Sequence, residues 1–553
     1  MSIFNTKTID NKKQQFPHWY SPETGIYQSK YPSINLPSDP FLDVVTFIFS
    51  SKPHQKSVSN YEALIDSSSG VSISYSDLFP LVKSIASGLI SKGVSKGDVV
   101  LALLPNSIYF PIILLGVMYS GAIFTPMNPL STAAEIKNRV ADCNPCLAFT
   151  VPDKVQALHA LGISAIMVPE SPRVKIDDKS GPIPNPDFSE FTRLVTIARD
   201  NDTTVTAPVI NQDDTAAIMY SSGTTGASKG VVLSHGNFIA MVEVFVRFEA
   251  SLYEYQSWQV VYLALLPMFH VYGMCHFAMG LLALGSKVVV MKRFDIKEVV
   301  NSIEKFKVTH LTVVPPILPF LTKAAKEVGG QKRFESLKQV SFGAAPSSRK
   351  IIQDLVQTLP HVDFIQGYGM TETTATGCRG FNTKKLRNYS SAGLLLPNTQ
   401  AKVVDWKTGS FLPPGSIGEL WLRGPGVMKG YLNNAAETRS TLDEDGWLRT
   451  GDIVYFDQNA YLYIIDRLKE MIKYKGFQIA PADLESVLAS HPEILDFGVA
   501  GVTDEECGEI PVAFVVRRQG SSLSHEDVMN YVARQCVLSI KTRYKKSILL
   551  MFG

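Results

Sequence analysis

The chain has 553 residues, of which 45% are hydrophobic and 19% are charged, a composition that excludes intrinsic disorder as the overall state and predicts a large buried core. Its 53 basic and 51 acidic residues leave a net charge of +2, so no global basic field indicates a nucleic-acid partner. Six cysteines are too few for a disulfide scaffold, and the CxxC pair Cys143 and Cys146 has no second ligand pair for zinc, so we interpret these residues as structural thiols.

Residues 1–40 are rich in Pro, Ser and Tyr and predict an extended N-terminal arm without the pattern of a signal peptide. Two long uncharged stretches follow, 99–134 and 255–286. Proline, glycine or histidine interrupts both, so they indicate a buried α/β layer rather than membrane spans. From about residue 60, helical stretches alternate with short apolar runs, which predicts parallel sheets with helices on their faces.

After about residue 390 the chain changes to short strands separated by Gly, Pro and Asp turns, which predicts a smaller β-rich subdomain. Beyond Asp466-Arg467 two helices and two strands suffice for a small α+β module. The predicted fold class is therefore α/β, with a large domain of stacked α/β sheets over 41–466 and a small α+β domain over 467–553.

The strongest local motif is YSSGTTGASKG at residues 220–230, directly after an apolar run. A loop of small residues leaves its backbone N–H groups free to converge on an anion, and its hydroxyls and lysine add further donors. The motif is not a Walker A sequence, because Lys229 stands between Ser228 and Gly230. The motif predicts a phosphate-binding loop.

A second motif, QGYGMTE at residues 366–372, offers three kinds of contact. Tyr368 has a flat face for a base, Thr371 has a hydroxyl for phosphate, and Glu372 has the hard oxygen ligands that suit Mg²⁺. Taken alone, Asp452 in TGD is typical of an ordinary turn residue. Asp466-Arg467, taken alone, is typical of a plain ion pair.

Seven motifs occur in the order found in the adenylate-forming superfamily, which includes acyl-CoA synthetases and beetle luciferases, and the chain resembles that superfamily over about residues 40–535. Two segments, YKGFQIAPADLE and LDEDGWLRTGD, are similar to plant 4-coumarate–CoA ligases and their ligase-like relatives. The seven motifs are YSSGTTGASKG, PMFHVYG, GAAP, QGYGMTE, GELWLRG, TGD and IIDRLKEMIKYKGFQIAPADLE.

The resemblance implies a ligase that joins a carboxylate to ATP, releases pyrophosphate, and passes the acyl group from the adenylate to the thiol of coenzyme A. It implies ATP, coenzyme A and an aromatic acid as substrates, Glu372 as the ligand of Mg²⁺, and 467–553 as a lid domain that rotates about a hinge near Arg467–Lys469. The catalytic residues implied are Lys229, Thr371, Glu372 and Lys473.

The same resemblance implies three sets of binding residues. The nucleotide set is Ser221, Ser222, Gly223, Thr224, Thr225, Gly226, Lys229, Ala344, Gln366, Gly367, Tyr368, Thr371, Asp452, Arg467 and Gln478. The acyl set is His270, Tyr272, His276, Lys469 and Lys473, and the coenzyme A set is Arg293, Lys475 and Gly476. The alternative interpretation of the histidines is ordinary core packing. The alternative interpretation of the lysines is a solvated surface face.

The sequence departs from the family after Gln535. The resemblance implies a later Pro-Lys-Ser-x-x-Gly-Lys motif whose last lysine enters the adenylation site, and no such motif follows here. We therefore expect an incomplete lid domain and adenylation slowed on the order of 10²–10³-fold or more. An altered reading of the gene, such as a splice form, is the alternative interpretation of this tail. The last residues do not form a peroxisomal tripeptide, so the expected compartment is the cytosol, with the peroxisome as the alternative for an intact parent form.

The leading hypothesis is an acid–CoA ligase of phenylpropanoid metabolism that acts on 4-coumarate or a related hydroxycinnamic acid. Three alternatives stay open: a ligase for fatty or oxylipin-type acids, a luciferase-type oxygenase, and an adenylation-deficient protein that binds nucleotide and acyl group without turnover. We expect no nucleic-acid partner and no transmembrane segment, and the sequence leaves the oligomeric state open.

Overall fold

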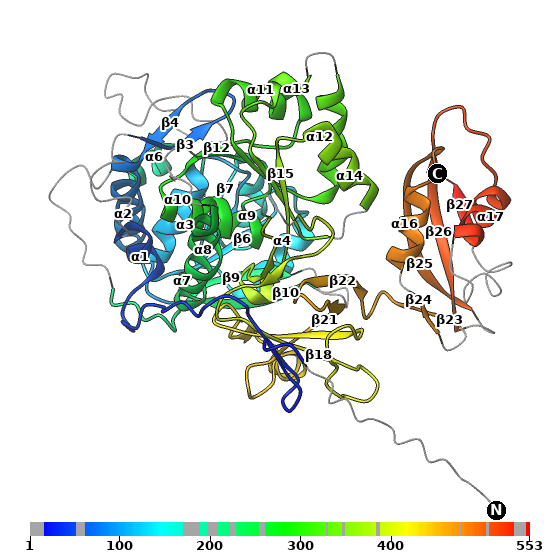
Figure 1. Cartoon of the computed structure of the whole chain (residues 1–553). Helices are drawn as coiled ribbons and strands as arrows, with labels where there is room; N and C mark the ends of the chain where they lie inside the picture. The colour runs from blue at the N-terminus through cyan, green and yellow to red at the C-terminus, as the bar shows by residue number, and fades with distance from the viewer. Residues whose placement is uncertain are drawn as a thin grey trace, which may run out of the picture.

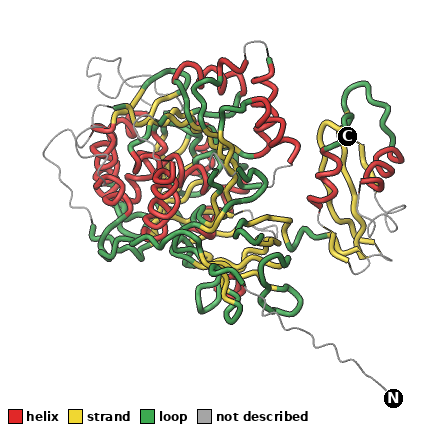
Figure 2. The backbone as a smooth tube through the Cα atoms, in the orientation of Figure 1, coloured by secondary structure: helices red, strands yellow, loops and turns green. Residues whose placement is uncertain are grey.

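The computed structural model of the chain describes residues 16–50, 61–169, 188–196, 208–221, 228–253, 260–327, 330–345, 349–382, 387–474, 477–479, 481–504, 508–535 and 549–552. These residues form a large body on three sheets and a smaller C-terminal unit on a fourth (Figure 1). Helices pack around the strands of the body (Figure 2). This mixed architecture confirms the predicted α/β fold class.

The first large sheet has seven strands and carries the predicted phosphate-binding loop at one edge. In spatial order the strands are β20 (Gly430–Tyr431), β10 (Lys229–Ser234), β9 (Thr215–Ser221), β6 (Ile123–Met127), β5 (Val99–Leu103), β7 (Leu147–Thr150) and β8 (Ser164–Met167). In this order, neighbouring strands from β9 to β8 are parallel, whereas β10 is antiparallel to both β9 and β20. The apolar runs at 99–103 and 123–127 are thus strands of a sheet buried on both faces.

The second large sheet has nine strands. In spatial order the strands are β17 (Leu394–Leu395), β16 (Gly377–Arg379), β15 (Asp363–Gly369), β14 (Gln339–Phe342), β13 (His310–Val313), β11 (Val261–Ala264), β12 (Lys287–Val290), β3 (Glu62–Asp66) and β4 (Ser72–Ser74). In this order, neighbouring strands from β15 to β3 are parallel. The antiparallel strands lie at the two edges, β17 and β16 at one and β4 at the other.

The helices of the body cover these sheets. Helix α3 (Tyr109–Tyr119) is buried along almost its whole length, as a helix that is apolar on every side should be. The others are α1 (Val44–Ser50), α2 (Tyr75–Ser91), α4 (Ala133–Cys143), α5 (Val155–His159), α6 (Ser189–Thr196), α7 (His235–Met241), α8 (Phe248–Tyr253), α9 (Val271–Gly273), α10 (Leu281–Leu284), α11 (Ile296–Phe306), α12 (Leu318–Lys326), α13 (Gly330–Arg333), α14 (Arg349–Thr358) and α15 (Ala435–Thr441). Within the part of the chain that the structure describes, no helix has both the length and the apolar character to cross a bilayer.

A third sheet of six antiparallel strands forms the β-rich part of the body, as expected for the region after about residue 390. Its strands are β1 (Tyr20–Ser21), β2 (Ile26–Gln28), β18 (Gln400–Val404), β19 (Gly418–Arg423), β21 (Leu448–Phe456) and β22 (Leu462–Arg467). The described part of the expected N-terminal arm therefore adds two strands to this sheet. Tyr27 is fully buried there and donates a hydrogen bond to the carbonyl of Leu412 at 2.7 Å.

The C-terminal unit has its own sheet and stands to one side of the body in Figure 1. Its sheet consists of β24 (Phe477–Ile479), β23 (Ile472–Tyr474), β26 (Gly508–Arg517), β25 (Ile494–Asp504) and β27 (Leu549–Phe552). Helices α16 (Pro481–Ala489) and α17 (His525–Gln535) supply side chains to a separate hydrophobic cluster around Leu484, Leu488 and Val528. A core of its own allows such a unit to move as one body.

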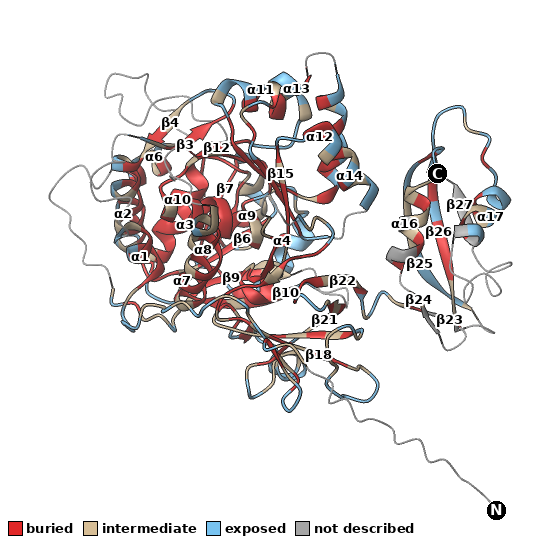
Figure 3. Ribbon diagram, in the orientation of Figure 1, coloured by how far each residue is buried: buried red, intermediate tan, exposed pale blue. Residues whose placement is uncertain are grey.

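Buried residues fill the interior of the body (Figure 3). One hydrophobic cluster joins the two large sheets, and a second lies in the six-stranded sheet, where the rings of Tyr27 and Phe456 stack with centroids 4.7 Å apart. Strand β9 ends at Ser221, β14 at Phe342 and β15 at Gly369, so the carboxyl ends of parallel strands from both large sheets meet at one place. Open α/β sheets commonly bind ligands at such carboxyl ends.

Candidate active site

A cavity of about 510 Å³ opens where these strand ends meet the six-stranded sheet. It collects residues from motifs that lie far apart in the chain, including Ser221, Lys229, His270, Tyr272, Ala344, Gly367, Tyr368, Thr371, Glu372, Arg467 and Lys469. Each of these eleven residues was predicted from the sequence as a binding or catalytic residue. A cavity of this volume is in the range of small-molecule sites.

Lys229 begins β10, and its ammonium group forms an ion pair with the carboxylate of Glu437 on α15. The lysine is half-buried, and its Nζ also lies 5.2 Å from the ring centroid of Tyr431. The charge of Lys229 is therefore compensated from within the chain, and an incoming phosphate has to compete with Glu437 for it.

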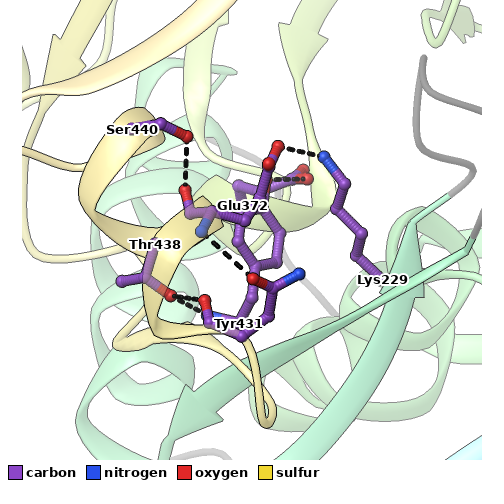
Figure 4. Close-up of polar contacts among 7 residues, drawn as sticks. Lys229, Glu372, Tyr431, Thr438 and Ser440 are labelled. Carbon is purple, nitrogen blue, oxygen red and sulfur yellow. Dashed lines mark hydrogen bonds and ion pairs between the residues drawn. The ribbon is translucent and has the colours of Figure 1, made fainter.

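Glu372 lies in a short 3-10 helix, Thr371–Thr373, directly after the glycine-rich end of β15. Its carboxylate is buried, and its Oε1 accepts a hydrogen bond of 3.0 Å from the hydroxyl of Tyr431 (Figure 4). The backbone carbonyl of Glu372 accepts from the N–H of Met428 at 2.8 Å, which fixes the turn against the segment before β20. One fixed carboxylate suits a metal ion that takes its other ligands from phosphate and water.

Tyr368 and Asp452 connect the nine-stranded sheet with the six-stranded sheet. The hydroxyl of Tyr368 donates to Oδ2 of Asp452 at 2.5 Å, and Nε of Arg467 lies 3.4 Å from Oδ1 of the same carboxylate. Burial raises the pKa of Asp452, while the hydrogen bond from Tyr368 and the charge of Arg467 act in the opposite direction. Burial and the charge of Asp452 raise the pKa of Tyr368, so the phenol stays protonated and acts as the hydrogen-bond donor.

The wall beside Tyr368 is formed by the turn after β14 and by β15 itself. Gln366 is buried opposite Phe342 in the parallel pairing of these strands, and Gly367 follows it on the cavity wall. Ala344 has a φ of 68°, a left-handed conformation that a residue with a side chain rarely adopts. Such backbone strain persists where the surrounding structure holds the residue, commonly at functional sites.

His270 and Tyr272 line the cavity from the start of α9, but His276 does not. The ring of His276 is buried behind Tyr272, with centroids 6.2 Å apart, and packs 5.3 Å from Tyr262. Among the described residues, neither of its nitrogens has a hydrogen-bond partner. Burial lowers the pKa of His276 to about 3, so this ring is neutral and belongs to the aromatic packing around a small second cavity.

Other predicted residues lie away from the cavity or outside the described residues. Arg293 is exposed on the loop between β12 and α11, and it does not line the cavity. The backbones of Lys473 and Gln478 are paired in the register of the antiparallel strands β23 and β24. The predicted residues outside the described part are Ser222, Gly223, Thr224, Thr225, Gly226, Lys475 and Gly476. Ser221 is the last residue of β9, at the start of the predicted phosphate-binding loop. Its Oγ atom is buried and has no hydrogen-bond partner among the described residues.

The sequence did not predict Tyr431, Glu437 or the buried ion pair of Arg379 with Glu249 at this site. Glu437 is 208 residues from Lys229, and Glu249 is 130 residues from Arg379, so no local spacing connects either pair. The one available signal was an arginine among small and apolar residues in GCRGF, where a charged side chain needs a buried partner.

The described residues include no cluster of three or more His, Cys, Asp and Glu side chains that could hold a metal ion by themselves. The AMP-binding enzyme family model matches residues 52–432, and the model for the AMP-binding enzyme C-terminal domain matches residues 483–543. The chain therefore belongs to the AMP-binding enzyme family of adenylate-forming ligases, as the resemblance predicted.

Similar proteins narrow the class to CoA ligases. The chain is 58% identical to 4-coumarate–CoA ligase-like 6 of Arabidopsis thaliana, over 98% of this chain and 92% of that protein. It is 42% identical to peroxisomal OPC-8:0-CoA ligase 1 of the same species, over 92% and 90% of the two chains. Among solved structures, ATP-bound MatB from Rhodopseudomonas palustris shares the fold, with a TM-score of 0.77 at 24% identity over 92% of this chain and 95% of that one.

Proposed function

We propose that this chain is an ATP-dependent acid–CoA ligase that forms an acyl-adenylate and then an acyl-CoA thioester, with 4-coumarate or a related hydroxycinnamic acid of phenylpropanoid metabolism as the acid. The observation that carries the proposal is the single cavity that holds Lys229, Glu372 and Tyr368, the last bonded to Asp452. A cation, a hard carboxylate and an aromatic face with an adjacent acceptor match the triphosphate, metal ion and nucleoside of ATP.

In the first step an oxygen of the acid attacks the α-phosphorus of ATP, and the bond from that phosphorus to the pyrophosphate oxygen breaks. Lys229 would leave Glu437 and bind the outer phosphates, together with the loop from Ser221 to Gly226. Thr371 would donate to the α-phosphate. These donors act on charge that moves onto the departing pyrophosphate, which is where fixed donors contribute most to the rate.

The nucleoside would bind between the wall formed by Ala344, Gln366 and Gly367 and the face of Tyr368. Asp452 would accept hydrogen bonds from the two ribose hydroxyls, with Arg467 beside it. An ionised carboxylate has about four acceptor positions, so the hydrogen bond from Tyr368 leaves room for the ribose.

The donor set fits Mg²⁺. Glu372 offers one buried carboxylate, and Mg²⁺ is usually held by one or two carboxylates together with substrate phosphates and water. When bound, the ion supplies positive charge to the phosphate oxygens. The hydrogen bond from Tyr431 orients the carboxylate for that role.

For the second step we propose that the C-terminal unit acts as a lid hinged near Arg467–Lys469. Lys469, Lys473 and Gln478 would contact the adenylate. Coenzyme A would approach Arg293, Lys475 and Gly476, and its sulfur would attack the acyl carbon while AMP leaves. The separate core of the C-terminal unit supports such a rotation. His270 and Tyr272 would line the acyl end of the cavity.

The decisive experiment is pyrophosphate release by the purified chain with ATP, Mg²⁺ and a panel of cinnamic, fatty and oxylipin acids. Release with hydroxycinnamic acids supports the proposal, whereas preferred release with oxylipin acids supports the alternative that the 42% identical OPC-8:0-CoA ligase suggests. Binding of ATP and acid without release with any acid supports the adenylation-deficient alternative. Thioester formation from supplied 4-coumaroyl-adenylate and coenzyme A tests the second step by itself.

The cytosol and the peroxisome are both proposed compartments, and one relative is named as peroxisomal. Microscopy of the chain with a fluorescent protein fused at its N-terminus, beside a peroxisomal marker, distinguishes the two.

A further inference from the structure

The wall of the cavity includes one member of a buried ion pair that the proposed steps do not use. Nε of Arg379 donates to Oε2 of Glu249 at 2.8 Å, and Nη2 donates to Oε1 at 2.7 Å. Arg379 is 6% exposed and Glu249 is 8% exposed. A two-pronged pair of this kind is the geometry in which opposite charges tolerate burial.

Arg379 lies at the front of the pair and Glu249 behind it. Arg379 lines the same cavity as Lys229 and Glu372, whereas Glu249 lines the small second cavity near His276. Burial acts to lower the pKa of Arg379, but the charge and hydrogen bonds of Glu249, together with Tyr272 and Tyr253, outweigh burial. The pKa of Arg379 is therefore raised above its usual range, and the guanidinium stays charged.

One nitrogen of the guanidinium is not engaged by Glu249. The two hydrogen bonds use Nε and Nη2, and Nη1 lies on the side of Gly367, where a Cβ atom added to that glycine would come within 3.1 Å of it. Gly367 is itself part of the cavity wall. Arg379 also lies within electrostatic reach of Tyr272, which is proposed to line the acyl end of the same cavity. The guanidinium of Arg379 therefore borders the space in which the acid is proposed to bind.

The surroundings of the guanidinium are mostly apolar or aromatic. Its central carbon lies 5.3 Å from the ring centroid of Phe245, and Cys378 and Leu396 line the same cavity. Tyr272 adds a hydroxyl whose proton the positive charge of Arg379 influences, although burial dominates and raises the pKa of that phenol. A fixed charged donor in a largely apolar wall is typical of a site that recognises a polar atom of a ligand.

The chemistry of the far end of the acid decides how well it fits this wall. A hydrocarbon end would remove solvent from the guanidinium without replacing its hydrogen bonds, which costs binding energy. An acceptor oxygen at that end would take a charge-assisted hydrogen bond instead. Sites built around such a donor discriminate strongly against analogues that lack the polar atom.

We propose that Arg379, held in place by Glu249, determines specificity by selecting acids that carry an acceptor oxygen at the end remote from the carboxylate, such as a phenol, over acids that end in hydrocarbon. This inference rests on the proposed ligase function. It extends that function by assigning the choice between hydroxylated and plain substrates to one residue pair.

The test compares kcat/KM for 4-coumarate and for cinnamate, which differ by one phenolic oxygen. The native chain should prefer 4-coumarate on the order of 10- to 100-fold. The double substitution Glu249→Leu with Arg379→Met replaces the pair by apolar side chains, which buried ion pairs commonly tolerate. In that variant the ratio should fall to near one, with the KM for ATP unchanged.

Arg379→Lys keeps the charge and loses the fork, so its ratio should fall at least about threefold. Arg333→Met removes a comparable arginine from an exposed pair with Glu304, and it should leave the ratio unchanged. Retention of the native ratio in the double variant, or in Arg379→Lys if the double variant does not fold, would overturn the inference.

Calorimetric binding of the two acids provides a readout that does not need turnover. A chain that releases no pyrophosphate but binds 4-coumarate more tightly than cinnamate, with the preference lost in Arg379→Lys, would contradict the proposed ligase activity and support the role of Arg379. A chain that turns over both acids equally would support the ligase activity and contradict the role of Arg379.

Discussion

The hydroxyl of Tyr368 donates a hydrogen bond of 2.5 Å to Oδ2 of Asp452, although 84 residues separate the two in the chain. Tyr368 belongs to β15 of the nine-stranded sheet, and Asp452 belongs to β21 of the six-stranded sheet. The contact therefore fixes the aromatic face proposed for adenine relative to the carboxylate proposed for ribose.

Asp452→Asn should weaken ATP binding by about 10- to 100-fold, because hydrogen bonds to a charged acceptor contribute about 1.5–3 kcal/mol each. Tyr368→Phe keeps the ring and removes only the donor, so its loss of affinity should be a few-fold. Isothermal titration calorimetry with ATP measures both. Equal losses in the two variants would contradict the assignment of Asp452 to the ribose.

Glu437→Gln should increase the affinity for ATP several-fold, because Lys229 no longer has to leave a carboxylate before it binds phosphate. Lys229→Met should lower the affinity instead. Arg439→Gln, on the exposed side of the same helix α15, is the matched control and should leave the affinity for ATP unchanged. An unchanged ATP affinity in Glu437→Gln would mean that the ion pair does not compete with the nucleotide.

Glu372→Gln should raise the Mg²⁺ concentration at which ATP binding is half-maximal by about tenfold or more, because a neutral amide is a weaker ligand for a hard cation. Tyr431→Phe removes the hydrogen bond to Oε1 of Glu372 and should cause a smaller shift in the same direction. The measurement is ATP affinity across a Mg²⁺ titration. A normal midpoint in Glu372→Gln would assign the metal to another ligand.

Stability should fall as the pH falls below about 6.5, the pKa of an unfolded histidine. Burial lowers the pKa of His235 to about 4 and the pKa of His276 and of His310 to about 3. The folded chain keeps these rings neutral while the unfolded chain binds protons, so each reduces the free energy of unfolding by up to about 1.4 kcal/mol per pH unit down to its folded pKa.

The check is the thermal unfolding midpoint between about pH 7.5 and about pH 5. His276→Phe should make the dependence shallower, and it sacrifices no hydrogen bond known from the described residues. His159→Gln on the exposed surface of α5 is the control. The same pH dependence in His276→Phe and in the native chain would contradict the neutral buried ring.

Gly393→Ala should destabilise the chain far more than Gly409→Ala. Both glycines have a left-handed backbone, with φ of 96° and 72°, so both substitutions carry about 1–2 kcal/mol of backbone strain. A Cβ atom at Gly393 would also lie 2.0 Å from the backbone carbon of Arg379, whereas nothing lies within 4 Å of one at Gly409. Similar thermal unfolding midpoints for the two variants would contradict the close approach of Gly393 to β16.

The sequence was sufficient for the fold class and the family because both depend on local patterns. Alternation of apolar runs with helical stretches predicted the parallel sheets, and the order of seven motifs predicted the adenylate-forming family. The chemistry proposed for Lys229, Thr371 and Glu372 also follows from residue types within short segments, and it stays a prediction until the variants are measured.

Only the tertiary structure decided which side chains share the cavity. Tyr272 and His276 are four residues apart, a spacing that places them on one face of a helix, yet only the tyrosine reaches the cavity, because the histidine lies in a π-helix (Met274–Gly280) and packs among aromatic rings. Arg379 enters the site because a carboxylate 130 residues earlier in the chain makes its burial tolerable. Burial, charge compensation and side-chain direction depend on partners that are distant in sequence, and the folded chain alone brings those partners together.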